Sequence, residues 1–578
     1  MQSSRPATNP SAISAELRRC AMAFAAVAVF SGFVNLLYLS SSLFMMEVYD
    51  RVLPSRSVPT LIGLLIIVAI LYVFQAVFDW VRSRLLLRIA DRIDIQLSPR
   101  VYDAVVRLQL RAPATARSSQ PLRDLDTLRG FLASSGPAAF FDLPWLPFYL
   151  AVCFAFHFWI GVTALAGAVI LALLTVVSEF AARRPMQEAA GHALGRGRLF
   201  EASRRHAELI SVLGMAPRLR SRWLNASRAH ANANARAGDL TSGLGALSKM
   251  LRMMLQSGVL AVGAWLVIND KASAGVIIAG SILSARALAP VDLVIANWKG
   301  FVAARQSKAR LDATLALLGD EPARMALPTP RHALAVQNVT TTAPESQTVI
   351  LHDVSLTLAA GSGLGVIGPS ASGKSSFARL LAGVWTPLRG AVRLDGATLD
   401  QWPPEALARH IGYMPQATAL IEGTIAENIA SFDPEAKPEE IIAAARAAGV
   451  HDLVVNLPQG YQTRIDDHAA QLSSGQQQRI ALARALYGEP FLVILDEPNS
   501  NLDAEGEEAL TQAIIGVRSR GGVVVVVAHR PSALAGVDHV LMLAGGRVQA
   551  FGPKEEVLSA VLRPAAVPSR KINEGVAA

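Results

Sequence analysis

The sequence predicts two structural classes in one chain, a membrane-embedded α-helical domain followed by an α/β domain of the phosphate-loop type. Hydrophobic residues make up 52% of the 578 residues and charged residues only 17%, with a mean hydropathy of +0.35. The apolar excess lies before residue 300, and a G-x-x-x-x-G-K-S segment follows it. This distribution excludes an ordinary water-soluble enzyme, because long apolar stretches need a bilayer and the glycine-rich segment is typical of phosphate binding.

The apolar part contains six stretches close to the roughly 20 residues that a helix needs to cross a bilayer. They are residues 21–44, 60–80, 138–156, 160–178, 250–268 and 274–295. The alternative is a large buried helical core. Because the first four stretches carry almost no internal charge, we expect six transmembrane helices.

Arginine placement predicts the orientation of these helices. Cations are concentrated in the N-terminal tail and in the long segments after the second and fourth stretches: Arg5, Arg18 and Arg19; Arg82, Arg84, Arg88, Arg92, Arg100, Arg107 and Arg111; Arg183, Arg184, Arg196, Arg198, Arg204, Arg205 and Arg218. The short links between paired stretches hold few, so the arginine-rich segments are expected to be cytoplasmic. We expect them to form long helices, with breaks near Pro113 and near residues 214–217.

The same arginines account for the net charge of +9 and the pI near 9.8. A nucleic-acid partner is not expected, because no basic patch is interleaved with aromatic residues. The two cysteines, Cys20 and Cys153, fall at or inside apolar stretches and form neither a disulfide framework nor a metal-ligand spacing. We interpret them as small apolar residues of helices.

The phosphate loop predicts a nucleotide site. An apolar run at residues 364–367 reads as a buried strand, and a helical pattern begins at Lys374. Glycines let backbone N–H groups turn toward phosphate oxygens, Lys374 can reach the β- and γ-phosphates, and the Ser375 hydroxyl can ligate Mg²⁺. The expected ATP-binding residues here are Gly368, Pro369, Ser370, Ala371, Ser372, Gly373, Lys374, Ser375 and Ser376.

A second motif supplies acids. Five apolar residues, 491–495, are followed by Asp496 and Glu497. A parallel strand buried on both faces has this composition, and its carboxyl end should open at the nucleotide crevice. We expect Asp496 to hold Mg²⁺, directly or through water, and Glu497 to act as the general base on the attacking water. Taken alone, the motif is more often a strand that ends at the surface.

Residues 472–479, LSSGQQQR, resemble the LSGGQ signature of ABC transporter ATPases. The companion motifs of that family are present in order: Gln416, the segment Ser500–Asp503 and His529. The resemblance implies that two ATPase domains pair head to tail and that Ser473, Gly475 and Gln476 contact the ATP of the partner. It also implies catalytic roles for Gln416 and His529 and a metal contact for Gln416. Ser474 replaces the first glycine of the usual signature.

Residues 49–54 (YDRVLP), 141–147 (FDLPWLP), 285–290 (ARALAP) and 496–503 (DEPNSNLD) are similar to type I secretion exporters, above all the protease-exporter branch. The resemblance implies a homodimeric half-transporter of the ABC exporter type in the bacterial inner membrane, with its ATPase domain in the cytoplasm. It further implies a periplasmic adaptor protein, an outer-membrane channel and an unfolded protein cargo with a C-terminal secretion signal.

The expected organisation has five parts. They are a cytoplasmic tail at 1–20, a transmembrane domain at 21–304, a linker at 305–331, an ABC ATP-binding domain at 332–560 and a C-terminal tail at 561–578. The expected function is ATP-driven protein export. Two alternatives stay open: an ABC exporter of lipids or small molecules, and a regulator that uses its ATPase domain without transport.

Two departures from expectation need structural information. Arg286 lies about 12 residues into the sixth apolar stretch, or about 18 Å along a helix, and it either forms an ion pair, with Asp292 or another span, or lines the export path. The second departure is Ala343, which occupies the place where many relatives stack the adenine on an aromatic ring. How the adenine is held is therefore not evident.

Overall fold

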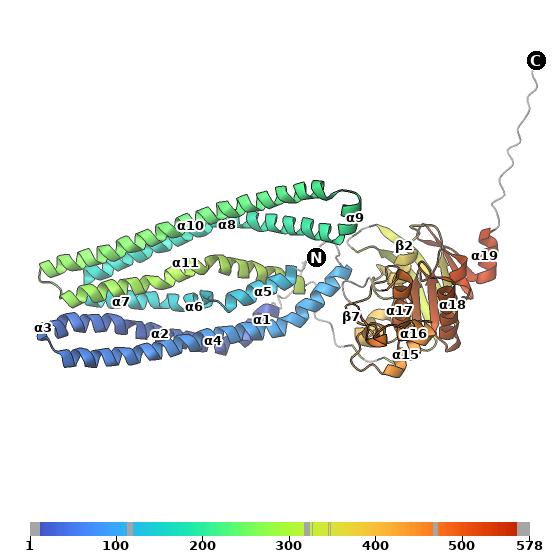
Figure 1. Ribbon diagram of the computed structural model, residues 1–578, viewed down its shortest axis with the longest axis horizontal. Coiled ribbons are helices and arrows are strands. Elements are labelled where there is room, and N and C mark those ends of the chain that lie inside the picture. Colours follow the sequence, from blue (N-terminus) through green and yellow to red (C-terminus); the bar gives the residue numbers. More distant parts are fainter. Residues whose placement is uncertain are drawn as a thin grey trace, which may run out of the picture. The chain divides into compact units, whose positions relative to one another are not determined.

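The computed structural model describes residues 12–111, 120–316, 324–325, 327–344, 346, 348–465 and 472–562. The chain divides into two compact units, which we call the helical unit (Met1–Val105 and Ser118–Gly319) and the sheet unit (Val106–Arg117 and Asp320–Ala578). The expected break near Pro113 lies outside the described residues. Figure 1 shows the helices and strands that make up each unit.

The helical unit is built almost entirely of long helices. Its elements, with the last turns of α4 counted in the sheet unit, are α1 (Ala12–Arg19), α2 (Ala21–Glu47), the π-helical turn η1 (Val48–Val52), α3 (Leu53–Ser55), α4 (Val58–Arg111), α5 (Gln120–Leu132), α6 (Ser135–Asp142), η2 (Leu143–Trp145), α7 (Leu146–Phe156), α8 (Phe158–Arg205), α9 (Ala207–Val212), α10 (Ala216–Ile268) and α11 (Ala274–Ala316). Among the described residues, six helices or helix runs are long and apolar enough to span a membrane, as the sequence predicts.

Two helix boundaries bear on sequence-based expectations. The expected break near residues 214–217 is confirmed: α9 ends at Val212, Gly214 has a φ of +61°, and α10 begins at Ala216. The expected linker at 305–331 begins as helix, because α11 continues to Ala316. Leu311 is buried there, and Arg310 and Ser307 both donate hydrogen bonds to Asp124 of α5, so tertiary packing extends the helix beyond its apolar stretch.

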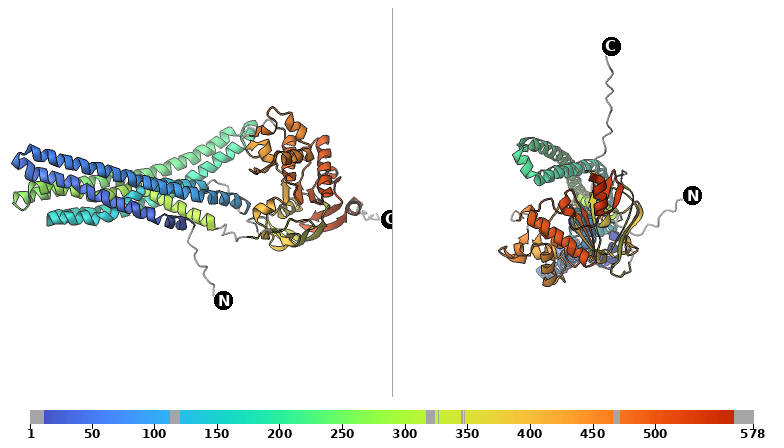
Figure 2. Two further views of the ribbon diagram at one scale, coloured as in Figure 1. Left: turned by 90° about the horizontal axis from the view of Figure 1, so that it is seen from below. Right: turned by 90° about the vertical axis from the view of Figure 1, so that its right-hand side faces the viewer.

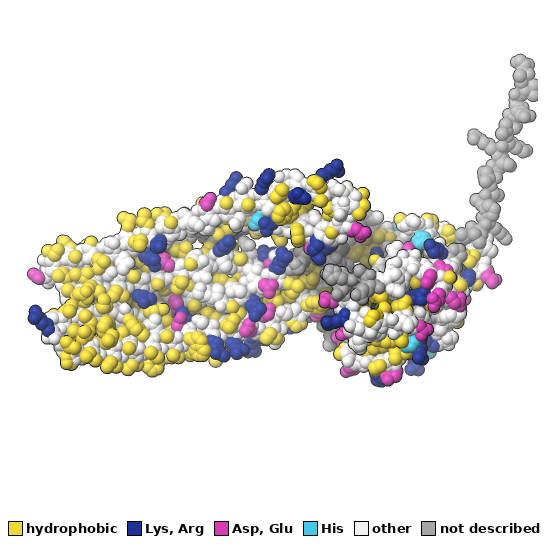
Figure 3. All heavy atoms as spheres, viewed as in Figure 1, with side chains coloured by type: hydrophobic (Ala, Val, Ile, Leu, Met, Phe, Trp, Pro, Cys, Tyr) yellow, Lys and Arg dark blue, Asp and Glu magenta, His cyan; other side chains and the backbone are white. Residues whose placement is uncertain are grey.

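Helix α11 organises the helical unit. It packs against α2, α5, α6, α7 and α10, and α8 and α10 run side by side along their length (Figures 1 and 2). One apolar cluster joins α1, α2, α4, α5 and α11, and a second joins α7, α8, α10 and α11. Figure 3 shows hydrophobic side chains covering the outside of these helices near α3, which is expected of a surface that faces lipid tails.

A buried ionic network ties the helices together inside this unit. The guanidinium of Arg82 on α4 donates to both carboxylate oxygens of Asp142 on α6, at 2.8 and 2.9 Å. Asn35 on α2 donates to the same carboxylate at 2.8 Å, and the Tyr149 hydroxyl of α7 donates to the Asn35 backbone oxygen at 2.7 Å. The network fixes four helices to one another, because a buried charge is tolerated only with partners.

The sheet unit alternates strands and helices. Its elements are β1 (Ala333–Thr342), β2 (Val349–Ala359), β3 (Gly363–Ile367), α12 (Lys374–Leu381), β4 (Arg389–Leu394), β5 (Ala397–Thr398), η3 (Leu399–Gln401), α13 (Pro404–Ala408), β6 (Ile411–Met414), β7 (Gly423–Thr424), α14 (Ile425–Ile429), α15 (Pro438–Ala447), α16 (His451–Val455), η4 (Gly460–Gln462), β8 (Arg464–Ile465), α17 (Ser474–Leu486), β9 (Leu492–Asp496), α18 (Ala504–Ser519), β10 (Val523–Val527), η5 (Pro531–Leu534), β11 (His539–Ala544), β12 (Arg547–Pro553) and α19 (Lys554–Leu562).

The central sheet has the strand order β12-β11-β3-β10-β9-β6, with every pair parallel except β11 and β12. Side chains of its central strands alternate between two cores. Val493 and Leu495 of β9 pack with α17 and α18, whereas Leu492 and Ile494 pack on the other face with α12 and the second sheet, β2-β1-β4-β5. Burial on both faces explains why β9 and β10 read as unbroken apolar runs.

Candidate nucleotide-binding site

Four neighbouring parallel strands deliver the predicted functional groups to one edge of the central sheet. The phosphate loop follows β3, His529 follows β10, Glu497 follows β9 and Gln416 follows β6. The parallel register pairs Val527 with Asp496 and Leu495 with Met414, so the strands end at the same level. The sequence motifs, spread over more than a hundred residues, are brought together because the carboxyl ends of parallel strands share one edge.

The backbone of the phosphate loop has the conformation that anion binding requires. Gly368, Ala371 and Gly373 have φ values of +147°, +62° and +97°. A Cβ at Gly368 would lie 2.0 Å from the backbone oxygen of Leu543, so this position accepts only glycine. Gly373 is the N-cap of α12, whose first N–H groups therefore face the loop.

Lys374 lies across this loop. Its ammonium donates to the backbone oxygens of Gly368 and Pro369, at 2.9 and 2.8 Å. Burial lowers the pKa of Lys374, and the carboxylates of Glu497 and Asp496 oppose that shift. The lysine therefore lies close to the two acids predicted from sequence, at the position where β- and γ-phosphate charges would be neutralised.

Asp496 and Ser375 form a pair that fits a magnesium ion. The Ser375 hydroxyl donates to Asp496 Oδ1 at 3.1 Å, and Asp496 is 1% exposed. Burial raises the pKa of Asp496, the Ser375 hydrogen bond lowers it, and the charge of Glu497 raises it further. Asp496 Oδ2 and the Ser372 hydroxyl oxygen are buried without a hydrogen-bond partner. A hydroxyl and a carboxylate with free oxygen lone pairs are ligands that Mg²⁺ accepts beside phosphate oxygens.

Glu497 and His529 are in direct contact, with Glu497 Oε1 3.0 Å from His529 Nε2. Glu497 has a φ of +53°, which is unfavourable for a non-glycine residue, and its N–H donates to the Val527 oxygen at the end of β10. This strained backbone conformation directs the Glu497 carboxylate away from the axis of β9 and toward the nucleotide site. Gln416 is exposed just beyond β6. The three predicted catalytic side chains therefore follow three adjacent strands.

The signature motif begins helix α17. Ser473 is the N-cap: its hydroxyl accepts from the Gln476 N–H, and the Gln476 side chain accepts from the Ser473 N–H. A Cβ at Gly475 would lie 2.7 Å from the Asn501 oxygen, so this glycine allows close packing on the segment after β9. Across the described residues, no hydrogen bond or ion pair joins Ser473, Gly475 or Gln476 to the phosphate loop of the same chain. The helix presents a capped N-terminus that its own loop does not use.

Sequence reasoning missed how the signature helix is coupled to the catalytic strand. Gln478 donates to the Glu497 backbone oxygen and the Ser500 hydroxyl, each at 3.3 Å, and accepts from the Asn501 N–H at 3.0 Å. Arg479 forms an ion pair with Asp503, which caps α18. The hydrogen bond from the Gly506 N–H and then the Arg479 contact lower the pKa of Asp503. The only signal in the sequence was the glutamine run after the signature.

Ala343 follows β1, whose Thr342 pairs with Val349 at the start of β2. Next to the loop, a Cβ on Gly373 would meet the side chains of Leu351 and Ile350. Aliphatic side chains therefore border the phosphate loop at Gly373, and how the adenine is held stays a prediction.

Arg286 of α11 does not pair with Asp292, so this expectation is wrong. Asp292 instead accepts a hydrogen bond from Arg252 of α10 at 2.7 Å. The Arg286 guanidinium lies 4.3 Å from the centre of the Tyr38 ring on α2, and among the described residues it has no carboxylate within 4.0 Å. The partner of Asp292 therefore comes from the neighbouring helix α10, and the packing of α10 on α11 decides this choice over Arg286 of the same helix. The alternative role, lining the export path, stays a prediction.

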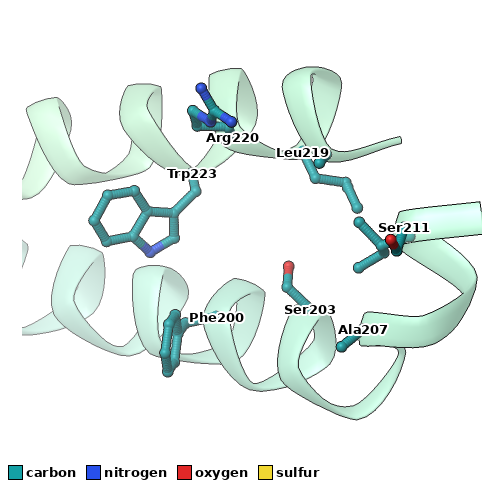
Figure 4. A pocket seen from close by; sticks show the side chains of 9 residues that line it. Phe200, Ser203, Ala207, Ser211, Leu219, Arg220 and Trp223 are labelled. Carbon is teal, nitrogen blue, oxygen red and sulfur yellow. The ribbon is translucent and has the colours of Figure 1, made fainter. Parts of the chain in front are cut away.

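The helical unit also has a hollow of about 410 Å³ where α8, α9 and α10 meet. Figure 4 shows Trp223 of α10 and Ser203 of α8 pointing into the hollow, with Ala207 at its α9 end. Its lining is mainly apolar and contains none of the predicted nucleotide-site residues. It marks the turn at which α8 reverses direction into α10.

Comparison with known proteins agrees with both units. A family model for the ABC transporter transmembrane region matches residues 24–291, and a second model, described as ABC transporter, matches residues 351–500. A solved bacterial Atm1-family ABC exporter with ATP bound has the same fold, with a TM-score of 0.81 at 23% identity over 94% of this chain and 96% of that one.

Relatives of known function indicate the branch of the family to which the chain is most similar. The type I secretion system ATP-binding protein PrsD of Rhizobium meliloti is 54% identical over 95% of this chain and 94% of its own length. The exotoxin translocation ATP-binding protein PaxB of Pasteurella aerogenes is 29% identical over 93% of this chain and 76% of its own. With a phosphate loop, paired acids and a signature helix placed as described, the chain belongs to the ABC transporter family, as an ATP-hydrolysing exporter of its type I secretion branch.

Proposed function

We propose that this chain forms a homodimer in the bacterial inner membrane and uses Mg²⁺-dependent ATP hydrolysis to export unfolded proteins that carry a C-terminal secretion signal. The observation that carries the proposal is the arrangement of the nucleotide site. The phosphate loop, Asp496, Glu497 and His529 share one sheet edge, whereas among the described residues the capped N-terminus of α17 makes no hydrogen bond or ion pair with the phosphate loop of its own chain. A second copy would complete the site with its Ser473 and Gly475.

Each group then has a distinct task. Lys374 and the N–H groups of the phosphate loop neutralise and hold the phosphates of ATP, while Ser375 and Asp496 hold Mg²⁺. When bound there, Mg²⁺ would supply positive charge that offsets the charge developing during phosphoryl transfer. Glu497 takes the proton from the attacking water, and His529, 3.0 Å away, orients that carboxylate.

Gln478 links the signature helix α17 to the strand that carries the catalytic Glu497. Because it bonds both the Glu497 backbone and the segment after it, a shift of the catalytic strand is transmitted to α17. The signature helix would therefore respond to the state of ATP in its own site while contacting ATP in the partner's site. This coupling supports a cycle in which hydrolysis weakens the dimer contact and moves the attached membrane helices.

Mixed dimers test the composite site. A dimer of one Ser473→Ala subunit and one Lys374→Ala subunit keeps one complete site, because the intact Lys374 faces the intact Ser473. A dimer of one wild-type subunit and one subunit with both substitutions contains the same changes but no complete site. We expect higher ATPase activity from the first dimer, and equal activity would contradict completion by the partner.

Secretion identifies the cargo class. The gene is deleted in the source cells and complemented with the wild-type chain or with Glu497→Gln. This variant keeps the transporter in the membrane but lacks the general base for ATP hydrolysis. We expect a small set of proteins without N-terminal signal peptides to vanish from the medium in both the deletion and the Glu497→Gln strain. Fusing their C-terminal segments to a reporter should restore its export, and this export should need a periplasmic adaptor and an outer-membrane channel. Loss of a lipid or small molecule in place of proteins would favour the alternative exporter class.

A further inference from the structure

A second recognition surface lies on α4, far from the nucleotide site in sequence and chemistry. A cavity of about 620 Å³ is lined by residues of α4 and by Ala133, which directly follows α5; the α4 residues are Trp80, Ser83, Arg84, Leu87, Arg88 and Asp91. The α4 residues recur at intervals of three and four, so they share one face of the helix.

This cavity sits where the apolar surface of α4 ends. The helix has the highest hydropathy of the six spans, and only 6% of its most apolar window is buried. Val73, Val77 and Trp80 are exposed in succession, at 64%, 46% and 60%, and arginines follow directly. Figure 3 shows Lys and Arg side chains gathered along α4 at the end of its hydrophobic cover. An exposed tryptophan followed by arginines is typical of the membrane–water boundary.

The cavity carries uncompensated positive charge. In the described part of the chain, neither Arg84 nor Arg88 has a carboxylate within 4.0 Å, although both are exposed on the cavity side. The neighbouring acids are engaged elsewhere: Asp79 accepts from Arg82 at 2.5 Å and Asp91 accepts from Arg129 at 3.2 Å. Arg82 itself is turned inward to Asp142. Two guanidinium groups are therefore left to face a ligand or solvent.

The geometry matches a phospholipid headgroup. The Arg84 guanidinium lies 5.3 Å from the Trp80 ring centre, which holds the cation beside the boundary residue. Arg84 and Arg88 lie about 6 and 12 Å beyond Trp80 along the helix. Side chains tilt toward the N-terminus of a helix, here toward the bilayer, which brings both cations to the depth of lipid phosphates.

We propose that Trp80, Arg84 and Arg88 form a binding site for the headgroup of an anionic phospholipid in the leaflet at this end of the span. The two arginines bind the phosphate and its net negative charge, and Trp80 packs against the glycerol and upper acyl region. The site anchors α4 at the point where Arg82, on the opposite face, joins the buried ionic network. Bound lipid thus lies at the level of the Arg82–Asp142 ion pair that joins α4 to α6.

Native mass spectrometry of the purified full-length transporter tests this site. Phosphatidylglycerol and phosphatidylcholine with identical acyl chains are titrated, because they differ in net headgroup charge. For Arg84→Gln/Arg88→Gln we expect about thirtyfold weaker phosphatidylglycerol binding, which corresponds to about 2 kcal/mol and to about 1 kcal/mol for each arginine at an anionic surface. Phosphatidylcholine binding should stay within twofold, and Arg84→Lys/Arg88→Lys should keep most of the affinity for phosphatidylglycerol.

The matched control is Arg198→Gln/Arg218→Gln, which removes the same charge from exposed positions on α8 and α10 about 30 Å or more from the apolar stretches. Equal loss in this control, or unchanged phosphatidylglycerol affinity in the cavity variant, overturns the proposal. Complete displacement of lipid by millimolar inorganic phosphate would assign the cavity to a free anion. Loss of dimers of the Arg84→Gln/Arg88→Gln variant in the same spectra would assign this face to contact between subunits. Displacement by phosphate or loss of dimers would each overturn the lipid proposal.

Discussion

Two buried aspartates, one in each unit, show opposite uses of a charge inside a protein. In the helical unit, both oxygens of Asp142 have donors, from Arg82 and Asn35. In the sheet unit, Asp496 Oδ1 accepts from Ser375, while Asp496 Oδ2 is buried with no partner. A satisfied carboxylate holds helices together, whereas an unsatisfied one is suited to a ligand that arrives later.

Glu497→Gln should have the largest effect, since it removes the base and keeps the shape of the site. We expect ATP turnover to fall by about 10²–10⁴-fold, the usual contribution of a general base, with ATP binding retained. Lys374→Ala is the contrasting variant, because it should weaken ATP binding itself. Steady-state ATPase assays and nucleotide titrations measure both quantities. Wild-type turnover in the Glu497 variant would remove this residue from the mechanism.

Replacing each aspartate by asparagine tests the comparison directly. Asp142→Asn leaves Arg82 without its buried counter-charge, because its other acidic partner, Asp79, is about half exposed. We expect a loss of about 3–5 kcal/mol, the usual result of breaking a buried ion pair. Asp496→Asn should leave stability unchanged or raise it, because a desolvated carboxylate is removed, while Mg²⁺-dependent hydrolysis is lost. Thermal unfolding of the purified protein, beside ATPase assays, measures the two effects. Similar unfolding midpoints for both variants would contradict the distinction.

Arg286 is a third kind of case, a charge in an apolar helix that stacks on Tyr38 and has no acid within 4.0 Å in the described residues. Because such a charge is costly in lipid, we expect its side chain to face water along the export path. A cysteine at position 286, in a variant lacking Cys20 and Cys153, should react with a water-soluble thiol reagent in the resting transporter. A cysteine at the exposed, apolar Ile66 of α4 is the lipid-facing control. Protection of position 286 in every nucleotide state would exclude the path.

The smallest expected effect concerns recognition of the adenine of ATP. Stacking on an aromatic ring is worth roughly 1–3 kcal/mol in nucleic-acid systems, and the alanine at position 343 cannot supply this contribution. GTP should therefore support hydrolysis within about tenfold of ATP in kcat/KM, since tenfold corresponds to about 1.4 kcal/mol. Ala343→Tyr should increase the preference for ATP. A preference above a hundredfold in the wild-type protein would mean that another group reads the adenine.

Local sequence was sufficient for the elements and for the chemistry of the nucleotide site. The strand before the phosphate loop, the helix beginning at Lys374 and the five-residue runs of β9 and β10 all follow from apolar runs and glycine positions. The six spans follow from length and composition alone. Each of these features depends on residues close together in the chain, where periodicity and motif spacing carry the information.

Partner choice between distant segments could not be predicted in this way. Nothing in the sequence pairs Arg82 with Asp142, Arg252 with Asp292 or Gln478 with the Glu497 backbone. The continuation of α11 to Ala316 likewise depends on contacts with α5. A charge or an amide accepts any suitable partner within reach, so the choice is made only when helix packing and strand order bring particular residues together. The sequence by itself determined the elements and the catalytic groups of this exporter, and the tertiary structure decided which buried charges hold it together and which stay open to ligands.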